Sequence, residues 1–271
     1  MASSEDIEVR PLLDAIYSRY HYDFRNYSPA SLKRRLASAQ LQMGADSLAS
    51  LQERVLRDPA TFTLLLQFLT VQVSDMFRDP SFFLAFRNKV VPELRTYPSI
   101  RVWIAGCSTG EELYSYAIVL REEGLLDRTT LYATDINPEA LRKAELGLYP
   151  IERMQAFTEN HRLAGGKSSL SEYYTAAYGS AAFTRTLRKN VVFSDHSLAT
   201  DSVFAEVQLV SCRNVLIYFD RLLQDRALGL MKDALCRRGF LGLGSKESLM
   251  FSEHRGAFRD FVPDERWYQR C

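Results

Sequence analysis

The sequence has little of what metal-binding and disulfide-rich proteins are built from. Its four cysteines form no Cys-x-x-Cys pair, and its four histidines are scattered without the spacing of metal ligands. We therefore expect reduced thiols and no metal site. The residues concerned are Cys107, Cys212, Cys236 and Cys271, and His21, His161, His196 and His254.

Long apolar runs and an excess of charge of one sign are also missing. Nowhere do about 18 uncharged apolar residues follow one another, and the amino terminus carries acids where a signal peptide has an apolar stretch. These absences predict a cytoplasmic protein with no direct membrane insertion. The formal net charge of +1 argues against a chain built chiefly to neutralise nucleic-acid phosphates.

The composition is that of an ordinary soluble protein, since 46% of the 271 residues are hydrophobic and 25% are charged. Residues 9–96 show helical periodicity with almost no strand signal. Helices are expected from Pro29 to Met43, from about Asp46 to Arg57, and over Thr61–Leu69. Pro98 disfavours helix just before it, so we place a helical domain and linker at residues 1–93.

From Ile100 onward, short apolar runs of strand length alternate with helical stretches. This alternation predicts a parallel, doubly wound sheet, which we assign to residues 94–271. A stretch at about 149–190, with a Gly-Gly pair and several tyrosines, interrupts the pattern and predicts an inserted subdomain. The strand-like runs are IRVWIAG, TLYATDI, NVVFSD, EVQLVSC and GFLGLG.

The run RVWIAGCSTGEE, residues 101–112, is typical of a buried strand that turns into a helix through small residues. Gly106 and Gly110 give a nucleotide-like ligand clearance to approach the backbone, and Asp135 ends the next strand, where a carboxylate can accept both hydroxyls of a ribose. Together they predict an adenosine pocket. A nicotinamide cofactor is the alternative, but its G-x-G-x-x-G pattern needs glycine where Ser108 stands. A tight connection with no ligand is the other interpretation of the two glycines.

Four further segments resemble motifs of the chemotaxis receptor methyltransferases, the CheR family, and they occur in the same order. The resemblance covers nearly the whole chain. It implies an α/β fold in which a Rossmann-like class I methyltransferase domain follows a small all-helical domain and carries a small β-subdomain insertion. The segments are VQVSDMFRDPSFF (71–83), STGEELYSYA (108–117), TDINPEALRKAELGLYP (134–150) and CRNVLIYFD (212–220), the last followed by GFLGLGSKESL.

The resemblance implies S-adenosyl-L-methionine as the cofactor and S-adenosyl-L-homocysteine as its product. Where the family commonly has Asn, Thr and Asn, this chain has Gln72, Ser74 and Ser197, which predicts retuned rather than abolished cofactor binding. The expected cofactor-binding residues are Gln72, Ser74, Arg78, Gly106, Glu112, Asp135, Ile136, Ser197, Leu198, Cys212 and Arg213.

The resemblance also implies glutamate side chains of chemoreceptor cytoplasmic helices as the methyl acceptors. A glutamate carboxylate, with a pKa of about 4.3, is anionic at neutral pH, so methyl transfer to it requires positioning and exclusion of water but no general base. Arg78 offers a planar fork to a carboxylate, and the resemblance places Arg213 and Tyr218 beside the reacting atoms. Apart from the family motifs, each of these three is more often an ordinary surface or packing residue.

Between Arg19 and Arg57, seven basic residues stand against three acidic ones. Lys33, Arg34 and Arg35 lie in the first turns of an expected helix, where the helix dipole disfavours cations, and this position suggests substrate binding. A solvated helix face is the alternative interpretation. The resemblance favours docking of receptor helices on this basic stretch.

Two other functions stay open. A signalling module that binds S-adenosylmethionine or S-adenosylhomocysteine without turnover is compatible with the changes at Gln72, Ser74 and Ser197. Nucleic-acid methylation is disfavoured, because CRNVL stands where an N-P-P-Y phrase is expected after the fourth strand. The sequence identifies no particular receptor, and the oligomeric state is open, with a monomer as one option.

Overall fold

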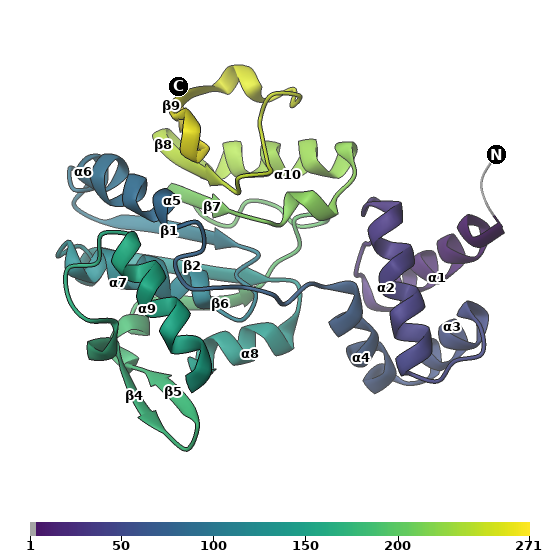
Figure 1. Ribbon diagram of the computed structural model, residues 1–271. Coiled ribbons are helices and arrows are strands. Elements are labelled where there is room, and N and C mark those ends of the chain that lie inside the picture. The colour runs from purple at the N-terminus through teal and green to yellow at the C-terminus, as the bar shows by residue number, and fades with distance from the viewer. Residues whose placement is uncertain (1–3) are drawn as a thin grey trace.

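The computed structural model describes the backbone of residues 4–271 and the side chains from Val9 onward. Figure 1 shows a helical domain beside an α/β body, joined by an extended segment. Among the described helices, none combines the length and apolar character that crossing a bilayer requires.

The helical domain forms where apolar residues recur at helical spacing between strong start signals. Ser47 accepts a hydrogen bond from the backbone N–H of Ser50, and Asp58 accepts from Ala60 and Thr61, so two of the helices begin with side-chain caps. The expected all-helical fold is confirmed. Its helices are α1 (Ser4–Tyr20), α2 (Pro29–Gln42), α3 (Leu48–Arg57) and α4 (Pro59–Leu69).

The body is built on a seven-stranded sheet with the order β6-β2-β1-β7-β8-β10-β9. The first five strands in this order are parallel, which confirms the doubly wound sheet, and the last two pair antiparallel. The strand order reverses direction between β1 and β7. The strands are β1 (Ile100–Ala105), β2 (Thr129–Asp135), β6 (Val191–Asp195), β7 (Val207–Cys212), β8 (Leu235–Leu243), β9 (Phe258–Val262) and β10 (Trp267–Arg270).

Alternate residues of β1 point to opposite faces of the sheet, and each face has its own core. Val102 and Ile104 pack with α5, α6 and α7, while Trp103 packs in the core that includes α10 and the helical domain. The apolar interior of the helical domain is thus continuous with one face of the body. The helices of the body are α5 (Pro80–Ala85), α6 (Val91–Leu94), α7 (Glu111–Glu122), α8 (Pro138–Leu146), α9 (Met154–Leu163) and α10 (Arg221–Ala234).

Short helical turns connect these elements. Residues Phe86–Val90 form the π-helical turn η1 between α5 and α6. The remaining turns are 3-10 helices: η2 (Leu126–Arg128), η3 (Ile151–Arg153), η4 (Leu170–Tyr173), η5 (Arg185–Arg188), η6 (Leu216–Tyr218), η7 (Arg255–Ala257) and η8 (Pro263–Glu265).

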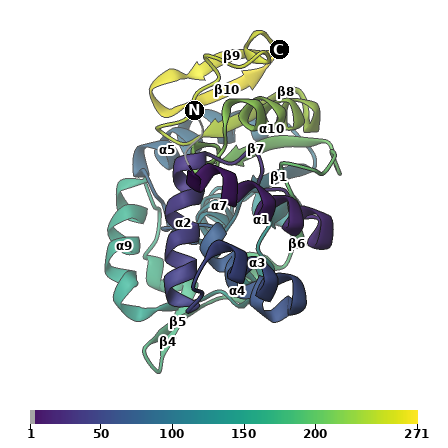
Figure 2. The same cartoon turned by 90° about the vertical axis from the view of Figure 1, so that its right-hand side faces the viewer.

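The expected insertion is present as a three-stranded antiparallel sheet, β3-β5-β4, made of β3 (Leu148–Pro150), β4 (Tyr174–Ala177) and β5 (Ser180–Phe183). Figure 2 looks onto the helical domain, with the β4–β5 hairpin at the opposite end of the molecule from β9 and β10. The division of the chain at residues 93 and 94 stays a prediction.

A buried ionic network ties α7 to η1 and α9. Glu122 accepts a hydrogen bond from Arg87 at 2.6 Å and lies 3.0 Å from Nε2 of His161, and its side chain is 2% exposed. Burial raises the pKa of Glu122, but the hydrogen bonds from His161 and Arg87 outweigh this effect and lower it to about 2. The carboxylate is therefore ionised in the folded protein well below neutral pH.

We expect Glu122→Gln to lower the free energy of unfolding by about 3 kcal/mol near neutral pH, because Arg87 loses a buried partner. The pKa of Glu122 is depressed by folding, so its stabilisation is present above the ordinary value of 4.5 and lost as the pH falls toward about 2. Urea titrations at about pH 7 and about pH 3.5 should show a smaller difference between variant and parent at the lower pH. An equal difference at both would contradict the assignment.

Candidate active site

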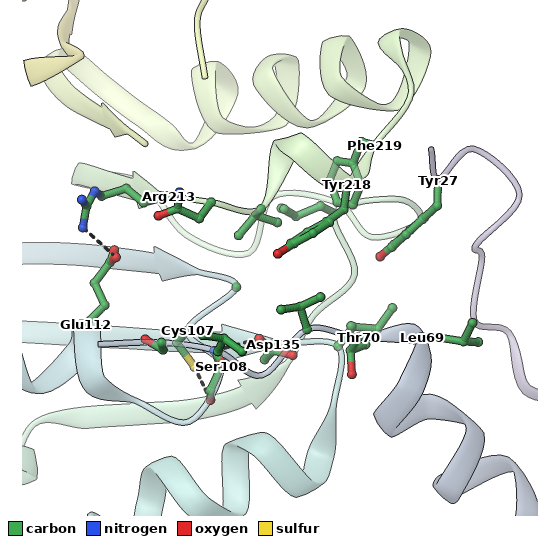
Figure 3. A pocket seen from close by; sticks show the side chains of 18 of the residues that line it. Tyr27, Leu69, Thr70, Cys107, Ser108, Glu112, Asp135, Arg213, Tyr218 and Phe219 are labelled. Atoms are coloured by element: carbon green, nitrogen blue, oxygen red, sulfur yellow. Dashed lines mark hydrogen bonds and ion pairs between the residues drawn. The ribbon is translucent and has the colours of Figure 1, made fainter. Parts of the chain in front are cut away.

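A pocket opens at the carboxyl ends of β1, β2 and β7, where the strand order reverses (Figure 3). It holds about 910 Å³, part of it open to solvent. The turns after β1 and β2, the loop after β7, the segment between α4 and α5, and the helical domain all contribute to its wall. We call residues 70–79, which run from α4 to α5 across the pocket, the strap.

Most of the predicted cofactor residues line this pocket, and so does Tyr218. Three do not: Gln72, Ser197 and Cys212. Cys212 ends β7 with its side chain fully buried in the core, and the Ser197 hydroxyl accepts the backbone N–H of Ala199. The predicted residues in the lining are Ser74, Arg78, Gly106, Glu112, Asp135, Ile136, Leu198 and Arg213.

Asp135, at the end of β2, organises the turn after β1. Its two carboxylate oxygens accept the backbone N–H groups of Ser108, at 2.8 Å, and Asn137, at 2.9 Å. Burial raises the pKa of Asp135, and these hydrogen bonds oppose the rise. Each oxygen keeps a lone pair with which to accept a ribose hydroxyl. Ser108 has a left-handed φ of 51°, and its N–H points at Asp135 where a dinucleotide pocket would offer it to a pyrophosphate.

Arg213 lies in a buried ionic cluster under the strap. Its guanidinium contacts Glu112 at 3.2 Å and Asp79 at 2.8 Å, and donates to the backbone carbonyl of Arg78 at 2.9 Å. It also stacks over the ring of Phe82, 4.0 Å from the centroid. Figure 3 shows the contact between Arg213 and Glu112 at the far end of the pocket from Tyr27 and Tyr218. Arg213 therefore fixes the backbone from which the Arg78 side chain projects.

The strap is fastened along its length, yet it leaves one guanidinium unpaired. Arg153 donates to Asp75 at 2.9 Å and to Glu111 at 2.6 Å, and the N–H of Phe77 donates to Ser115 at 2.8 Å. Arg78 is one of the residues that line the pocket, and its side chain has no hydrogen bond or ion pair with any described residue. It is the cation in this wall that is ready to receive a carboxylate of a ligand.

The helical domain completes the pocket by pairing with the loop after β7. Tyr27 forms an antiparallel bridge with Phe219, and the N–H of Ser28 donates to the carbonyl of Tyr218 at 2.8 Å. Arg35 packs its guanidinium 4.4 Å from the centroid of the Tyr218 ring. Figure 3 shows the hydroxyls of Tyr27 and Tyr218 pointing into the pocket.

Arg35 does not share an outer face with its two basic neighbours. It is 8% exposed and donates to the carbonyl of Leu69 at 2.5 Å, whereas Arg34 is exposed and Lys33 is partly buried. The cause is helical periodicity, because Arg35 falls on the same buried side of α2 as Leu32. Of the predicted substrate-binding trio, only Arg35 reaches the pocket.

Several buried polar atoms of the pocket wall have no hydrogen-bond partner within the described part of the chain. They are Nη2 of Arg35, Oγ of Ser108, Nδ1 of His196 and Nε of Arg213. Buried polar atoms of native proteins are normally paired, so the concentration of unpaired ones around one pocket indicates a ligand rich in polar groups. A nucleoside joined to an amino acid fits the atoms of Ser108, His196 and Arg213 together with Asp135.

Several residues that line the pocket were not among the predicted site residues. His196, named above only among the scattered histidines, lines the pocket and packs edge-on against Trp103, with ring centroids 5.3 Å apart. Tyr27 and Thr70 come from the helical domain and the start of the strap, and no local pattern marks them. The unassigned lining residues are Tyr27, Leu69, Thr70, Val71, Val73, Asp75, Cys107, Ser108, His196, Asn214, Val215 and Phe219.

Comparison with known families covers both parts of the chain. The all-alpha domain of CheR methyltransferases matches residues 7–70, and the SAM binding domain of CheR methyltransferases matches residues 72–262. The chain belongs to the CheR methyltransferase family. It is therefore an S-adenosylmethionine-dependent methyltransferase, and the cofactor expected from the sequence is confirmed.

Three relatives match this chain over most of its length and over most of their own. The chain is 62% identical to a methyltransferase named Cher3 of Pseudomonas putida, over 98% of this chain and 97% of that protein. It is 31% identical to chemotaxis protein methyltransferase 2 of Pseudomonas aeruginosa, over 82% of this chain and 78% of the relative. It is 27% identical to a chemotaxis protein methyltransferase of Listeria monocytogenes, over 84% of this chain and 85% of the relative.

The roles of single residues in cofactor binding stay predictions. The role of Asp135 is the one that can be tested most directly. We expect Asp135→Asn to weaken the affinity for S-adenosylhomocysteine at least about tenfold, because the ribose hydroxyls lose a charged acceptor. Titration calorimetry measures this affinity. Asp233→Asn, at a carboxylate that is 61% exposed on α10, should leave it unchanged. Equal affinities of the two variants would remove Asp135 from the ribose site.

Proposed function

We propose that this chain transfers the methyl group of S-adenosylmethionine to glutamate side chains on the cytoplasmic helices of chemoreceptors, forming glutamate methyl esters in chemosensory signalling in the cytoplasm. The relatives named as chemotaxis protein methyltransferases support the pathway. One observation supports a carboxylate as the methyl acceptor. The pocket wall formed by Arg35, Tyr218 and Tyr27 is cationic and rich in hydrogen-bond donors.

This wall suits a carboxylate. Nη2 of Arg35 is buried and unpaired, and the hydroxyls of Tyr27 and Tyr218 have no hydrogen-bond partner among the described residues. Burial raises the pKa of Tyr27, so its hydroxyl stays protonated and can donate. Burial lowers the pKa of Arg35, but a guanidinium remains charged at neutral pH. An anionic side chain therefore finds one charged donor and two neutral ones in this wall.

The cofactor supplies an electrophilic methyl carbon, whose bond to sulfur breaks as the bond to the glutamate oxygen forms, leaving S-adenosylhomocysteine and a methyl ester. The residues of the chain have to orient the acceptor and exclude water. Tyr218 and Arg35 hold the carboxylate, Arg78 receives the carboxylate of the cofactor's amino-acid part, and Arg213 positions Arg78 through its backbone. No proton has to move, because the acceptor is already ionised. The neutral ester is attracted less by Arg35, which favours product release.

The outer side of α2 is the proposed docking surface for the receptor. Arg34 is exposed there, next to the buried Arg35, and Lys33 lies beside it. An acidic receptor helix laid along α2 would meet these cations while its target glutamate enters the pocket.

The second candidate function is a module that binds the cofactor without turnover. The substitutions that suggested it now support it less. Gln72 and Ser197, two of the three substitutions that suggested it, lie outside the pocket lining. Only Ser74 lines the pocket.

Transfer of labelled methyl groups tests the proposed function. The purified chain with labelled S-adenosylmethionine should label receptor cytoplasmic fragments, and mild base should release the label, because carboxylate methyl esters hydrolyse readily. If no fragment of the panel is labelled under conditions where the cofactor binds, the proposal that receptor glutamates are the methyl acceptors is refuted. Base-stable label would point to a different acceptor atom.

Arg35 should act on the acceptor and not on the cofactor. We expect Arg35→Gln to lower kcat/KM for a receptor fragment about a hundredfold, since a buried charge-assisted contact is lost, while the affinity for S-adenosylhomocysteine changes little. The neighbouring variant Arg34→Gln, at an exposed position on the same helix, should lower kcat/KM only about threefold, and this effect should fade with added salt. Equal effects of the two substitutions would contradict the assignment.

A further inference from the structure

Glu247 is a buried carboxylate that lies outside the pocket and holds the loop after β7. It is 4% exposed, and no cation pairs with it in the described part of the chain. Oε2 accepts the backbone N–H groups of Asn214 at 2.9 Å and Gly244 at 2.7 Å. Oε1 accepts those of Val215 at 2.9 Å and Leu216 at 2.8 Å. All of its bonding capacity toward the protein is spent on the backbone.

Three consecutive N–H groups converge on one carboxylate only if the chain turns sharply. Asn214 has a left-handed φ of 60°, which costs a non-glycine residue energy and persists where the surroundings enforce it. Successive N–H groups in such a turn form a concave anion site, and Glu247 supplies the anion from within the protein. A buried carboxylate without these donors would be strongly unfavourable, so the turn and Glu247 stabilise each other.

The turn held by Glu247 separates two residues of the pocket. Arg213 immediately precedes it, with its guanidinium under the strap, and Tyr218 lies just beyond it at the end of η6. Between them, Val215 closes on the backbone after β1, because a Cβ on Gly106 would lie 2.5 Å from Cγ2 of Val215. Because Gly106 has no side chain, Val215 can pack against it, while Glu247 binds the backbone N–H groups of the same turn.

We propose that Glu247 is a positioning residue for methyl transfer, because it sets the turn that places Arg213 and Tyr218 on either side of the pocket. It acts through the backbone and touches neither cofactor nor acceptor. The activity part of its test rests on the proposed function, and a second readout is independent of it.

Glu247→Gln is the decisive variant. It preserves the size of the side chain but has one acceptor oxygen in place of two, and its amide N–H₂ faces backbone donors. We expect kcat to fall at least about tenfold. The affinity for S-adenosylhomocysteine should fall less than kcat, because the Asp135 site is intact and only the support of Arg78 through Arg213 is disturbed. Hydrogen exchange at the amides of Asn214, Val215 and Leu216 should accelerate at least about tenfold.

Glu122→Gln is the matched control, because it neutralises another buried carboxylate in a network away from the pocket. It should lower stability without changing kcat or exchange at residues 214–216, measured at a temperature where circular dichroism shows both variants folded. If Glu247→Gln does not fold, Glu247→Asp, which keeps the charge on a shorter side chain, replaces it with the same expected pattern.

Unchanged kcat and unchanged amide exchange in the folded Glu247 variant would overturn the proposal, and so would an equal loss of kcat in Glu122→Gln. If the chain methylates no receptor fragment, the proposed acceptor fails and amide exchange alone decides the role of Glu247. Faster exchange confined to residues 214–216 then supports the positioning role, and unchanged exchange refutes it.

Discussion

The active site depends on the backbone pairing between the helical domain and the loop after β7. Tyr27 bridges to Phe219, Ser28 donates to Tyr218, and the N–H of Asp220 donates to the carbonyl of Asn26 at 2.9 Å. The body alone provides Asp135 and the turn after β1, but it leaves the pocket without one wall. Because the apolar core of the helical domain continues into that of the body, the two parts meet as a packed interface, and the wall is held in place.

The charged groups around the pocket divide into those that shape it and those left for ligands. Arg213, Arg153 and Glu247 spend their hydrogen bonds on the strap and on the loop after β7. Arg78, Nη2 of Arg35 and Nε of Arg213 remain unpaired within the described chain. The proposed methyl transfer to an ionised carboxylate moves no proton, so its rate depends on how rigidly the unpaired groups are positioned. The first set supplies rigidity, and the second supplies recognition.

How much of this could be predicted from the sequence follows from how local each feature is. The turn after β1 and Asp135 are local to a strand and its exit, so small residues and a terminal acid revealed them. Arg35 was assigned to an outer surface although Leu32 and Leu36, at helical spacing around it, place it on the buried side. The place of Tyr27 in the pocket wall depends on its pairing with Phe219, which is far along the chain, so no local pattern could predict it. The strands β9 and β10 are short and carry charged residues, so no apolar run in the sequence predicted them.

We expect the cofactor to complete the unpaired groups near Asp135, in a pocket to which both parts of the chain contribute. A crystal structure of the chain with S-adenosylhomocysteine tests it most directly. We expect the ribose hydroxyls on Asp135, the amino-acid carboxylate on Arg78, and partners for Oγ of Ser108 and Nε of Arg213. A ligand bound elsewhere, or one that leaves these atoms unpaired beside an undisturbed pocket, would contradict it.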